Sequence, residues 1–203
     1  MKSLKRPLFV LALVLLAVGA LASTATAQSE RPKSPRGQAA TQVGPAFEHW
    51  VTVDYGRPIL RGRGGVFGSG EEYGKKVNAG APVWRAGANQ STRFATEVAL
   101  KFGDQTLPAG EYSLFIELAS PTEWNLILSN WGAQQQFSRD DKENLWGAYG
   151  YTAEKDVVKV PMQVMNIDLS VDQLTFGFIN GSAEGGALAV WWDNVMATAP
   201  FTL

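Results

Sequence analysis

The chain has 203 residues, no cysteine and a formal charge of −1, from 18 basic and 19 acidic side chains. The lack of cysteine excludes disulfides, thiol nucleophiles, cysteine metal ligands and a lipid attached through a cysteine, so the fold must rest on its apolar core. The near-neutral balance argues against nucleic acid as a partner, because neutralising phosphates requires a net basic face.

The N-terminus has the pattern of a signal peptide over residues 1–27. Three basic residues precede an apolar run over residues 8–22, and Ala25-Thr26-Ala27 supplies the small residues of a cleavage site. We therefore expect export to the periplasm or the exterior, with cleavage near Ala27 and no stable membrane insertion afterwards. An uncleaved anchor is the alternative. Cleavage leaves 15 basic against 19 acidic residues, a formal charge of −4.

Residues 28–37 are polar and contain Pro32 and Pro35, which predicts a linker that buries no apolar surface. Order is expected to begin near Gln38. Residues 38–203 are long enough to form one β-rich domain whose core is stable without disulfide bonds or other covalent cross-links.

The first predicted strand covers residues 47–55, where Val51, Val53 and Tyr55 alternate with polar or aromatic neighbours. It ends before Pro58, which cannot donate to a central ladder. Residues 60–80 are rich in glycine and follow neither the helical nor the strand period. We interpret them as a long ordered loop, a kind of segment that often carries function.

Alternation returns at Thr92 and predicts strands over residues 92–101, 112–118, 124–130, 158–164, 174–178 and 187–192. Turns are expected at Gly103-Asp104 and at residues 108–110. Pro161 indicates an edge position. The polar connection 131–144 has room for one helical turn near residues 139–143.

These segments predict an all-β fold, namely an antiparallel β-sandwich or flattened barrel of about eight or nine strands with a long Gly-rich loop. No amphipathic run is long enough for a major helix.

Several separated motifs resemble one family. They are Val53-Asp54-Tyr55-Gly56-Arg57-Pro58, Gly62-Arg63, Phe67-Gly68, Tyr73-Gly74, Trp84-Arg85-Ala86-Gly87-Ala88-Asn89, residues 107–115 and Trp146-Gly147-Ala148-Tyr149. In this order they are similar to the exported bacterial family known as domain of unknown function 2911. The resemblance covers the whole mature domain. It implies an exported, β-rich protein and assigns no activity.

The candidate site is centred on Trp84, Arg85 and Asn89, which combine an apolar ring, a planar cation and an amide within one short segment. If the Gly-rich loop folds over this segment, Arg57, Arg61 and Arg63 could converge with Arg85 on one anionic ligand. The alternative is that these arginines bind loop carbonyls and pair with Asp54 or Glu72.

Other candidates have weaker patterns. His49 is the only histidine, and no serine lies in a nucleophile-elbow pattern, so a surface or partly buried role is favoured. Paired carboxylates for glycoside hydrolysis could come from Asp54, Glu97, Glu111 or Asp193, although sequence does not give their separation. Trp191 and Trp192 face opposite sides of a strand. One interpretation is that both are covered, and the other is that one indole is exposed and stacks on a ligand. We favour the first.

We therefore predict a non-catalytic binding module for a small polar or anionic molecule or a glycan, with Arg57, Arg63, Trp84, Arg85 and Asn89 as ligand-binding residues. No catalytic residue, metal or cofactor is expected. The alternatives are a carboxylate-dependent hydrolase and a structural envelope protein without a ligand.

Overall fold

The computed structural model describes residues 33–203, in which Ser34–Leu203 form one compact unit. The predicted signal peptide and the first half of the predicted linker, residues 28–32, lie outside the described residues. The strands are β1 Arg36–Val43, β2 His49–Gly56, β3 Thr92–Thr96, β4 Leu100–Phe102, β5 Gln105–Leu107, β6 Gly110–Ser120, β7 Glu123–Ser129, β8 Gly132–Ala133, β9 Asn144–Leu145, β10 Asp156–Ser182 and β11 Gly185–Thr202. The helical elements are α2, Lys75–Asn78, and the 3-10 turns Gly70–Glu72 and Ala153–Lys155.

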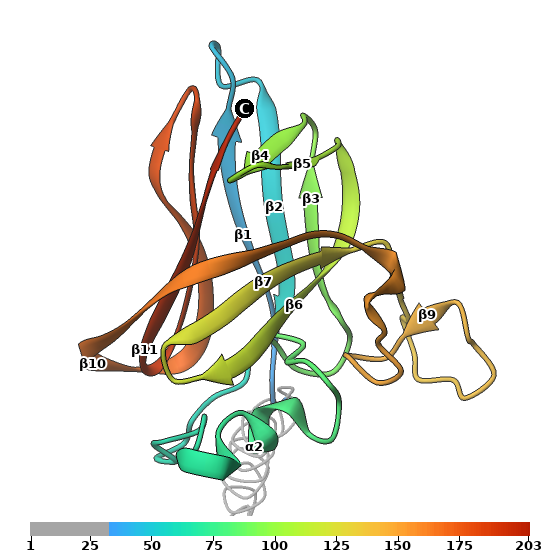
Figure 1. Cartoon of the computed structure of the whole chain (residues 1–203), viewed down its shortest axis with the longest axis vertical. Coiled ribbons are helices and arrows are strands. Elements are labelled where there is room, and N and C mark those ends of the chain that lie inside the picture. Colours follow the sequence, from blue (N-terminus) through green and yellow to red (C-terminus); the bar gives the residue numbers. More distant parts are fainter. Residues whose placement is uncertain (1–32) are drawn as a thin grey trace, which may run out of the picture. The chain divides into compact units, whose positions relative to one another are not determined.

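The predicted all-β fold is confirmed. Nine strands of the described chain form one sheet in the order β1-β2-β3-β6-β7-β10-β11-β4-β5, in which neighbouring strands run antiparallel. The sheet curls over itself into a sandwich-like fold without closing into a barrel (Figure 1). The β8–β9 pair is parallel and separate from the main sheet.

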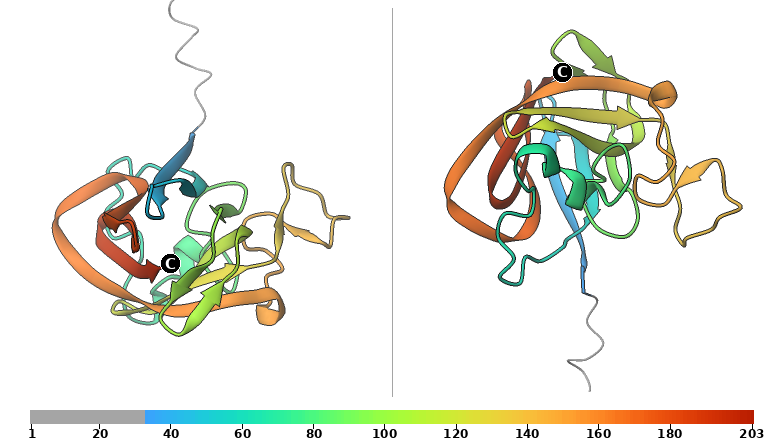
Figure 2. Two further views of the ribbon diagram at one scale, coloured as in Figure 1. Left: turned by 90° about the horizontal axis from the view of Figure 1, so that it is seen from above. Right: turned by 60° about the horizontal axis from the view of Figure 1, so that its bottom comes forward.

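Strand β10 joins the two parts of the fold. Its residues up to Met162 pair with β7, whereas those from Gln163 onwards pair with β11. Figure 2 shows the strand bending around the outside of the molecule between these two partners. The sequence predicts two strands here, but the chain passes through register shifts between Asn166 and Thr175 without a reversing turn. Irregular pairing of this kind bends a strand without ending it.

The predicted inward rows are confirmed. On β2, Val51, Val53 and Tyr55 are almost fully buried, and on β6 the same holds for Leu114 and Ile116. These residues belong to one large core cluster enclosed by the curled sheet. Fully burying each of these side chains contributes about 1.5–3 kcal/mol to folding before the loss of conformational entropy.

Strands β6 and β7 are buried on both faces. Phe115 and Ile127 point away from the main core into a second cluster, where they meet Trp131, Leu145 and Tyr151. The chain between β7 and β10 therefore folds back over the outer face of β6 and β7. This segment, residues 130–155, is called the excursion below.

The edge position predicted from Pro161 agrees with the pairing. The backbone N–H of Lys159 points away from β7 and donates to Oε1 of Gln105. Backbone groups two residues apart point the same way, so the missing N–H of Pro161 also lies on the side away from β7.

Some predicted boundaries differ from the structure. β1 begins at Arg36, so the last two residues of the predicted linker belong to the sheet, where a ladder with β2 satisfies their backbone without apolar side chains. The predicted strand 92–101 is broken after Thr96, whose hydroxyl donates to the carbonyl of Val98. No helical turn forms at residues 139–143, because the carboxylate of Asp141 binds the backbone N–H groups of Glu143 and Asn144 instead.

The loop over residues 60–80 is ordered, as predicted. It contains one 3-10 turn and the single turn of α2, and it contributes Leu60, Val66 and Phe67 to the main core. In Figure 1 this loop and α2 form the lower end of the domain, whereas β4 and β5 lie near the upper end.

Candidate functional site

The segment Val83–Thr92 connects the Gly-rich loop to β3, and Trp84 is its anchor. The backbone of Trp84 exchanges two hydrogen bonds with Ile116 on β6. Its indole is 1% exposed and lies parallel to that of Trp192, with ring centroids 6.1 Å apart. Trp84 is therefore part of the core, and its backbone pairing fixes the positions of its neighbours Arg85 and Ala86.

The rest of this segment is held where its backbone packs closely against the end of β2. Gly56, at the end of β2, leaves no room for a side chain, since a Cβ there would lie 2.1 Å from the carbonyl oxygen of Ala88. Asn89 has a positive φ of 66°, a conformation that asparagine adopts more readily than most residues. The turn places the carbonyl of Asn89 where the guanidinium of Arg85 can reach it.

Two predicted site residues, Arg57 and Arg63, hydrogen-bond to other parts of the chain. Arg57 donates to the carbonyl of Leu174 and the hydroxyl of Thr175. Arg63 donates through Nε to the carbonyl of Leu60 at 2.9 Å and through Nη2 to that of Ile59 at 3.0 Å. Arg63 matches the interpretation in which arginines satisfy loop carbonyls, whereas Arg57 binds strand β10. Neither forms an ion pair with Asp54 or Glu72 among the described residues.

Arg85 links the candidate segment to the excursion. Its Nη1 donates to the carbonyl of Asn89 at 2.6 Å, and its Cζ lies 5.2 Å from the centre of the Tyr149 ring. Gly147 packs directly against the guanidinium, since a Cβ there would lie 2.4 Å from the Arg85 Cζ. A cation over an aromatic face contributes about 0.5–2 kcal/mol, depending on how well water is excluded.

Four of the five predicted ligand-binding residues line one cavity of about 340 Å³, which we call the cationic pocket. Arg57 does not line it. The sequence did not predict one cation of the pocket, Lys76 on α2. Only its position in the Gly-rich loop could have indicated a role there. The lining residues are Pro58, Arg63, Val66, Lys76, Val77, Ala79, Trp84, Arg85, Gly87, Asn89 and Trp192.

The charge of this pocket is not balanced by any lining carboxylate. Among the described residues, Arg63, Lys76 and Arg85 form no ion pair. Glu72, on the same loop, pairs with Lys75 instead. Three positive groups thus border a cavity whose other walls are largely apolar.

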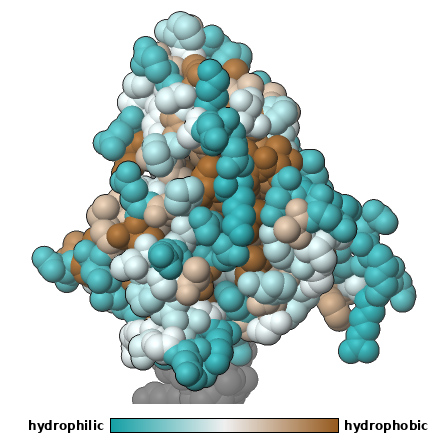
Figure 3. All heavy atoms as spheres, in the orientation of Figure 1, coloured by the Kyte–Doolittle hydropathy of each residue, from teal (hydrophilic) through white to brown (hydrophobic). Residues whose placement is uncertain are grey.

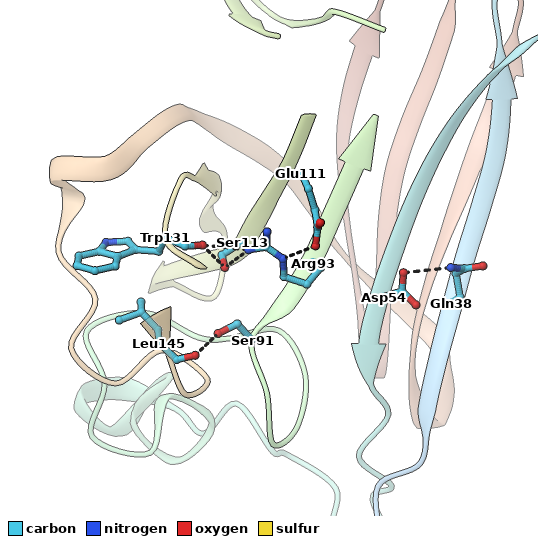
Figure 4. Close-up of polar contacts among 8 residues, drawn as sticks. All are labelled: Gln38, Asp54, Ser91, Arg93, Glu111, Ser113, Trp131 and Leu145. Atoms are coloured by element: carbon cyan, nitrogen blue, oxygen red, sulfur yellow. Dashed lines mark hydrogen bonds and ion pairs between the residues drawn. The ribbon is translucent and has the colours of Figure 1, made fainter. Parts of the chain in front are cut away.

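The four carboxylates considered for hydrolysis lie on three different strands and, for Glu97, in the bend after β3, and each has its own partner. Asp54 accepts from Gln38 and Glu111 accepts from Arg93 (Figure 4). Glu97 accepts from the backbone N–H of Trp50. Asp193 is buried and accepts from the N–H of Gly65 and the hydroxyl of Ser170. None of the four lines the cationic pocket.

His49 lies at the start of β2, with Nε2 3.7 Å from Oε1 of Glu48 and its side chain 38% exposed. Within residues 33–203, no three histidine or acidic side chains are grouped so that they could hold a metal ion. No helix in this part of the chain is both long and apolar enough to cross a membrane. Of the paired tryptophans, Trp192 is in the core and Trp191 is half-buried.

A second cavity, of about 430 Å³, lies in the excursion, and we call it the aromatic pocket. It is lined by Trp131, Gln134, Phe137, Ser138, Arg139, Asp141, Lys142, Asn144, Leu145, Trp146, Tyr149 and Gly150. Phe137 and Tyr149 are 59% and 45% exposed. From the sequence, this stretch was predicted only to be a polar connection followed by a family motif.

Polar contacts from Arg93 and Ser91 hold the excursion against the sheet. Arg93 on β3 donates to Glu111, to the hydroxyl of Ser113 and to the carbonyl of Trp131 (Figure 4). Ser91 contacts the carbonyls of Leu145 and Gly147 at 3.1 and 2.6 Å. These contacts fix both ends of the segment that carries the aromatic pocket.

Comparison with protein families gives one match. Residues 34–201 match the model of the family described as "Protein of unknown function (DUF2911)". The chain belongs to the DUF2911 family. The match covers nearly all of the compact unit, so both pockets of this DUF2911 protein lie inside the family domain. Searches of curated proteins and of solved structures each gave no match.

Proposed function

We propose that this DUF2911 protein is a non-catalytic binding module, and that its cationic pocket holds a small organic anion. The observation that carries the proposal is the set of Arg63, Lys76 and Arg85 at one cavity, without an ion pair among them and without a lining carboxylate. A carboxylate or phosphate group on the ligand would supply the missing negative charge.

The arginines are held in place before any ligand arrives. Arg63 uses two of its nitrogens on loop carbonyls, and Arg85 uses one nitrogen on Asn89 and its flat face on Tyr149. Because these side chains are already ordered, less conformational entropy is lost when a ligand binds. Each guanidinium keeps N–H donors beyond those used on the loop carbonyls, and these suit a carboxylate or phosphate.

The walls indicate an anion with an apolar portion. Val66, Val77 and Pro58 line the cavity beside the edges of Trp84 and Trp192. A ligand whose acidic group meets the cations would place its remaining carbon atoms against these side chains, which favours an organic over an inorganic anion.

Binding is favoured over carboxylate-dependent hydrolysis by the distribution of acidic groups. The cationic pocket has no lining carboxylate and the aromatic pocket has only Asp141. A glycosidase needs two carboxyl groups about 5–10 Å apart on either side of the scissile bond. Export remains a prediction and is consistent with an extracytoplasmic binding role.

Calorimetric titration of the purified protein at low ionic strength tests the proposal. The probes are sodium galacturonate, inorganic phosphate and, as an uncharged match to the first, galactose. We expect saturable binding of galacturonate and none of galactose, while the phosphate titration shows whether the anionic group alone suffices.

Two single-charge variants make the test specific to the pocket. Lys76→Ala removes a pocket cation that forms no ion pair among the described residues, and we expect about tenfold weaker binding. Lys101→Ala, an equally exposed lysine on β4, should leave affinity unchanged. Equal effects of the two substitutions, or no binding of either anion, would overturn the proposal.

A further inference from the structure

One side-chain contact connects the linings of the cationic pocket and the aromatic pocket. Arg85 lines the first, Tyr149 lines the second, and their side chains stack at 5.2 Å. Gly147 closes the gap behind this pair, because its hydrogen is all that fits beside the guanidinium. The Arg85–Tyr149 contact therefore places a lining residue of one pocket against a lining residue of the other.

The aromatic pocket presents rings to solvent. Phe137 and Tyr149 are about half exposed, and the ring of Phe137 lies 6.3 Å from that of Trp146 at an angle of 64°. Exposed aromatic side chains that line a cavity mark a contact surface more often than scattered apolar residues do. Indole and phenol rings also combine an apolar face with a polar edge, which suits a ligand that is itself part apolar and part polar.

The backbone that carries these rings is internally fixed. The amide of Gln134, 6% exposed, donates to the carbonyls of Ser138, Asp141 and Asn144 and accepts from the N–H of Ser138. Together with the contacts of Ser91 and Arg93 to the two ends of the excursion, this network orders a long segment that lacks regular secondary structure. The rings are exposed on an ordered support.

The lining of the aromatic pocket contains two cations, Arg139 and Lys142, and one carboxylate, Asp141. Arg139 and Lys142 are exposed, and no ion pair involves either in the described part of the chain. The one carboxylate, Asp141, is occupied by the N–H groups of Glu143 and Asn144 and the amide of Asn144. In Figure 3 the segment between β8 and β9, which projects at the right, is covered mainly by hydrophilic residues.

We propose that the two pockets form one extended site for an acidic oligosaccharide, with successive sugar rings in the cationic and aromatic pockets. This inference rests on the proposed function of the cationic pocket. Acidic sugar rings carry carboxylates for Arg63, Lys76, Arg85 and Arg139, and apolar C–H faces for Trp146 and Tyr149. An acidic peptide offers the charges without rigid ring faces. Nucleic acid offers both, but its charge density opposes a protein of net negative charge.

Titration with galacturonate oligomers of defined length tests the inference. The tetramer should bind on the order of tenfold or more tighter than the monomer, because linked rings engage the second pocket at high effective concentration. Arg139→Ala and Phe137→Ala should weaken binding of the tetramer several-fold and leave that of the monomer unchanged. Lys76→Ala should weaken both, and Lys101→Ala neither.

The outcomes separate this inference from the proposed function. If the monomer binds but the tetramer binds no tighter, or if Arg139→Ala has no effect on the tetramer, the extended site is wrong and the anion pocket stands. If neither oligomer nor monomer binds, both proposals fail. Polyglutamate and single-stranded oligothymidylate of matched charge serve as competitors. Equal or tighter binding of either would overturn the assignment to an acidic glycan.

Discussion

The guanidinium of Arg85 lies over the ring of Tyr149, with Cζ 5.2 Å from its centroid, and joins the loop before β3 to the excursion between β7 and β10. Each residue also lines a different cavity. The stack thus couples the position of a ligand-facing cation to the fold of a segment far along the chain.

Gly147→Ala should destabilise the protein more than Gly150→Ala. Both glycines have positive φ, 65° and 79°, so each substitution incurs the left-handed penalty of about 1–2 kcal/mol. Only at Gly147 would the new Cβ also meet the Arg85 guanidinium, whereas at Gly150 its nearest neighbour is 3.8 Å away. The clash should add about 1 kcal/mol or more, measured by urea unfolding.

A double mutant identifies the source of that extra cost. In an Arg85→Ala background the clash is gone, so Gly147→Ala should cost about as much as Gly150→Ala does in the parent protein. Equal costs for the two glycine substitutions in the parent would mean that the guanidinium moves aside freely.

Trp84→Ala should be among the most damaging substitutions. The indole is 1% exposed and contacts the rings of Phe67, Trp124 and Trp192. Removing a buried tryptophan of this kind costs about 3–5 kcal/mol. Trp50→Ala, at a tryptophan 45% exposed on β2, is the control and should change stability far less. Similar losses at the two positions would contradict the assignment of Trp84 to the core.

Arg93→Ala should loosen the excursion before it unfolds the sheet. The substitution removes hydrogen bonds to Glu111, Ser113 and the carbonyl of Trp131, a loss of about 1.5–3 kcal/mol. Hydrogen exchange should accelerate across residues 131–150 while β2 and β3 stay protected. Arg36→Ala, which removes one exposed contact to Gln90, is the control. Unchanged exchange in the excursion would show that its other contacts, such as those of Ser91, Gln90 and Ser113, hold it without Arg93.

Asp156→Asn should alter the pH dependence of stability. Desolvation raises the pKa of Asp156 above its ordinary value of 3.8, despite the hydrogen bond from Tyr151, which acts in the opposite direction. The folded state therefore binds the proton more tightly than the unfolded state, so this group's contribution to stability falls as pH rises from 3.8 through the raised pKa.

Melting curves of the parent and of Asp156→Asn across acidic pH measure this effect. The amide keeps an acceptor for the Tyr151 hydroxyl, which lies 2.6 Å from Oδ2 of Asp156, and does not titrate. The melting temperature of the variant relative to the parent should therefore rise with pH across that window. A constant difference would show that Asp156 has the same pKa folded and unfolded.

The period of the sequence predicted much of the fold because each inward row, such as Val51, Val53 and Tyr55, buries a single face. The prediction from alternation failed for strands that are buried on both faces or that change partner. Phe115 and Ile127 face a second cluster whose cover comes from the excursion, and no local signal identifies such a cover. The bend of β10 likewise depends on partners on two different strands.

The candidate site was predicted in part. Arg63, Trp84, Arg85 and Asn89 line one cavity, because the Trp84–Ile116 bridge and the Gly-rich loop bring them together. Arg57 instead binds the β10 backbone, a partner more than a hundred residues away. Lys76 and Tyr149 were missed because their positions depend on irregular backbone, for which residue types alone give no geometry.

The most direct measurement of the central claim is a nuclear magnetic resonance titration that follows the side-chain Nε–Hε signals of Arg63 and Arg85. Sodium galacturonate should shift both signals along saturable curves with one common dissociation constant, whereas galactose at matched ionic strength should leave them in place. If neither arginine signal responds to the anion, or if both respond equally to galactose, the cationic pocket is not an anion-binding site.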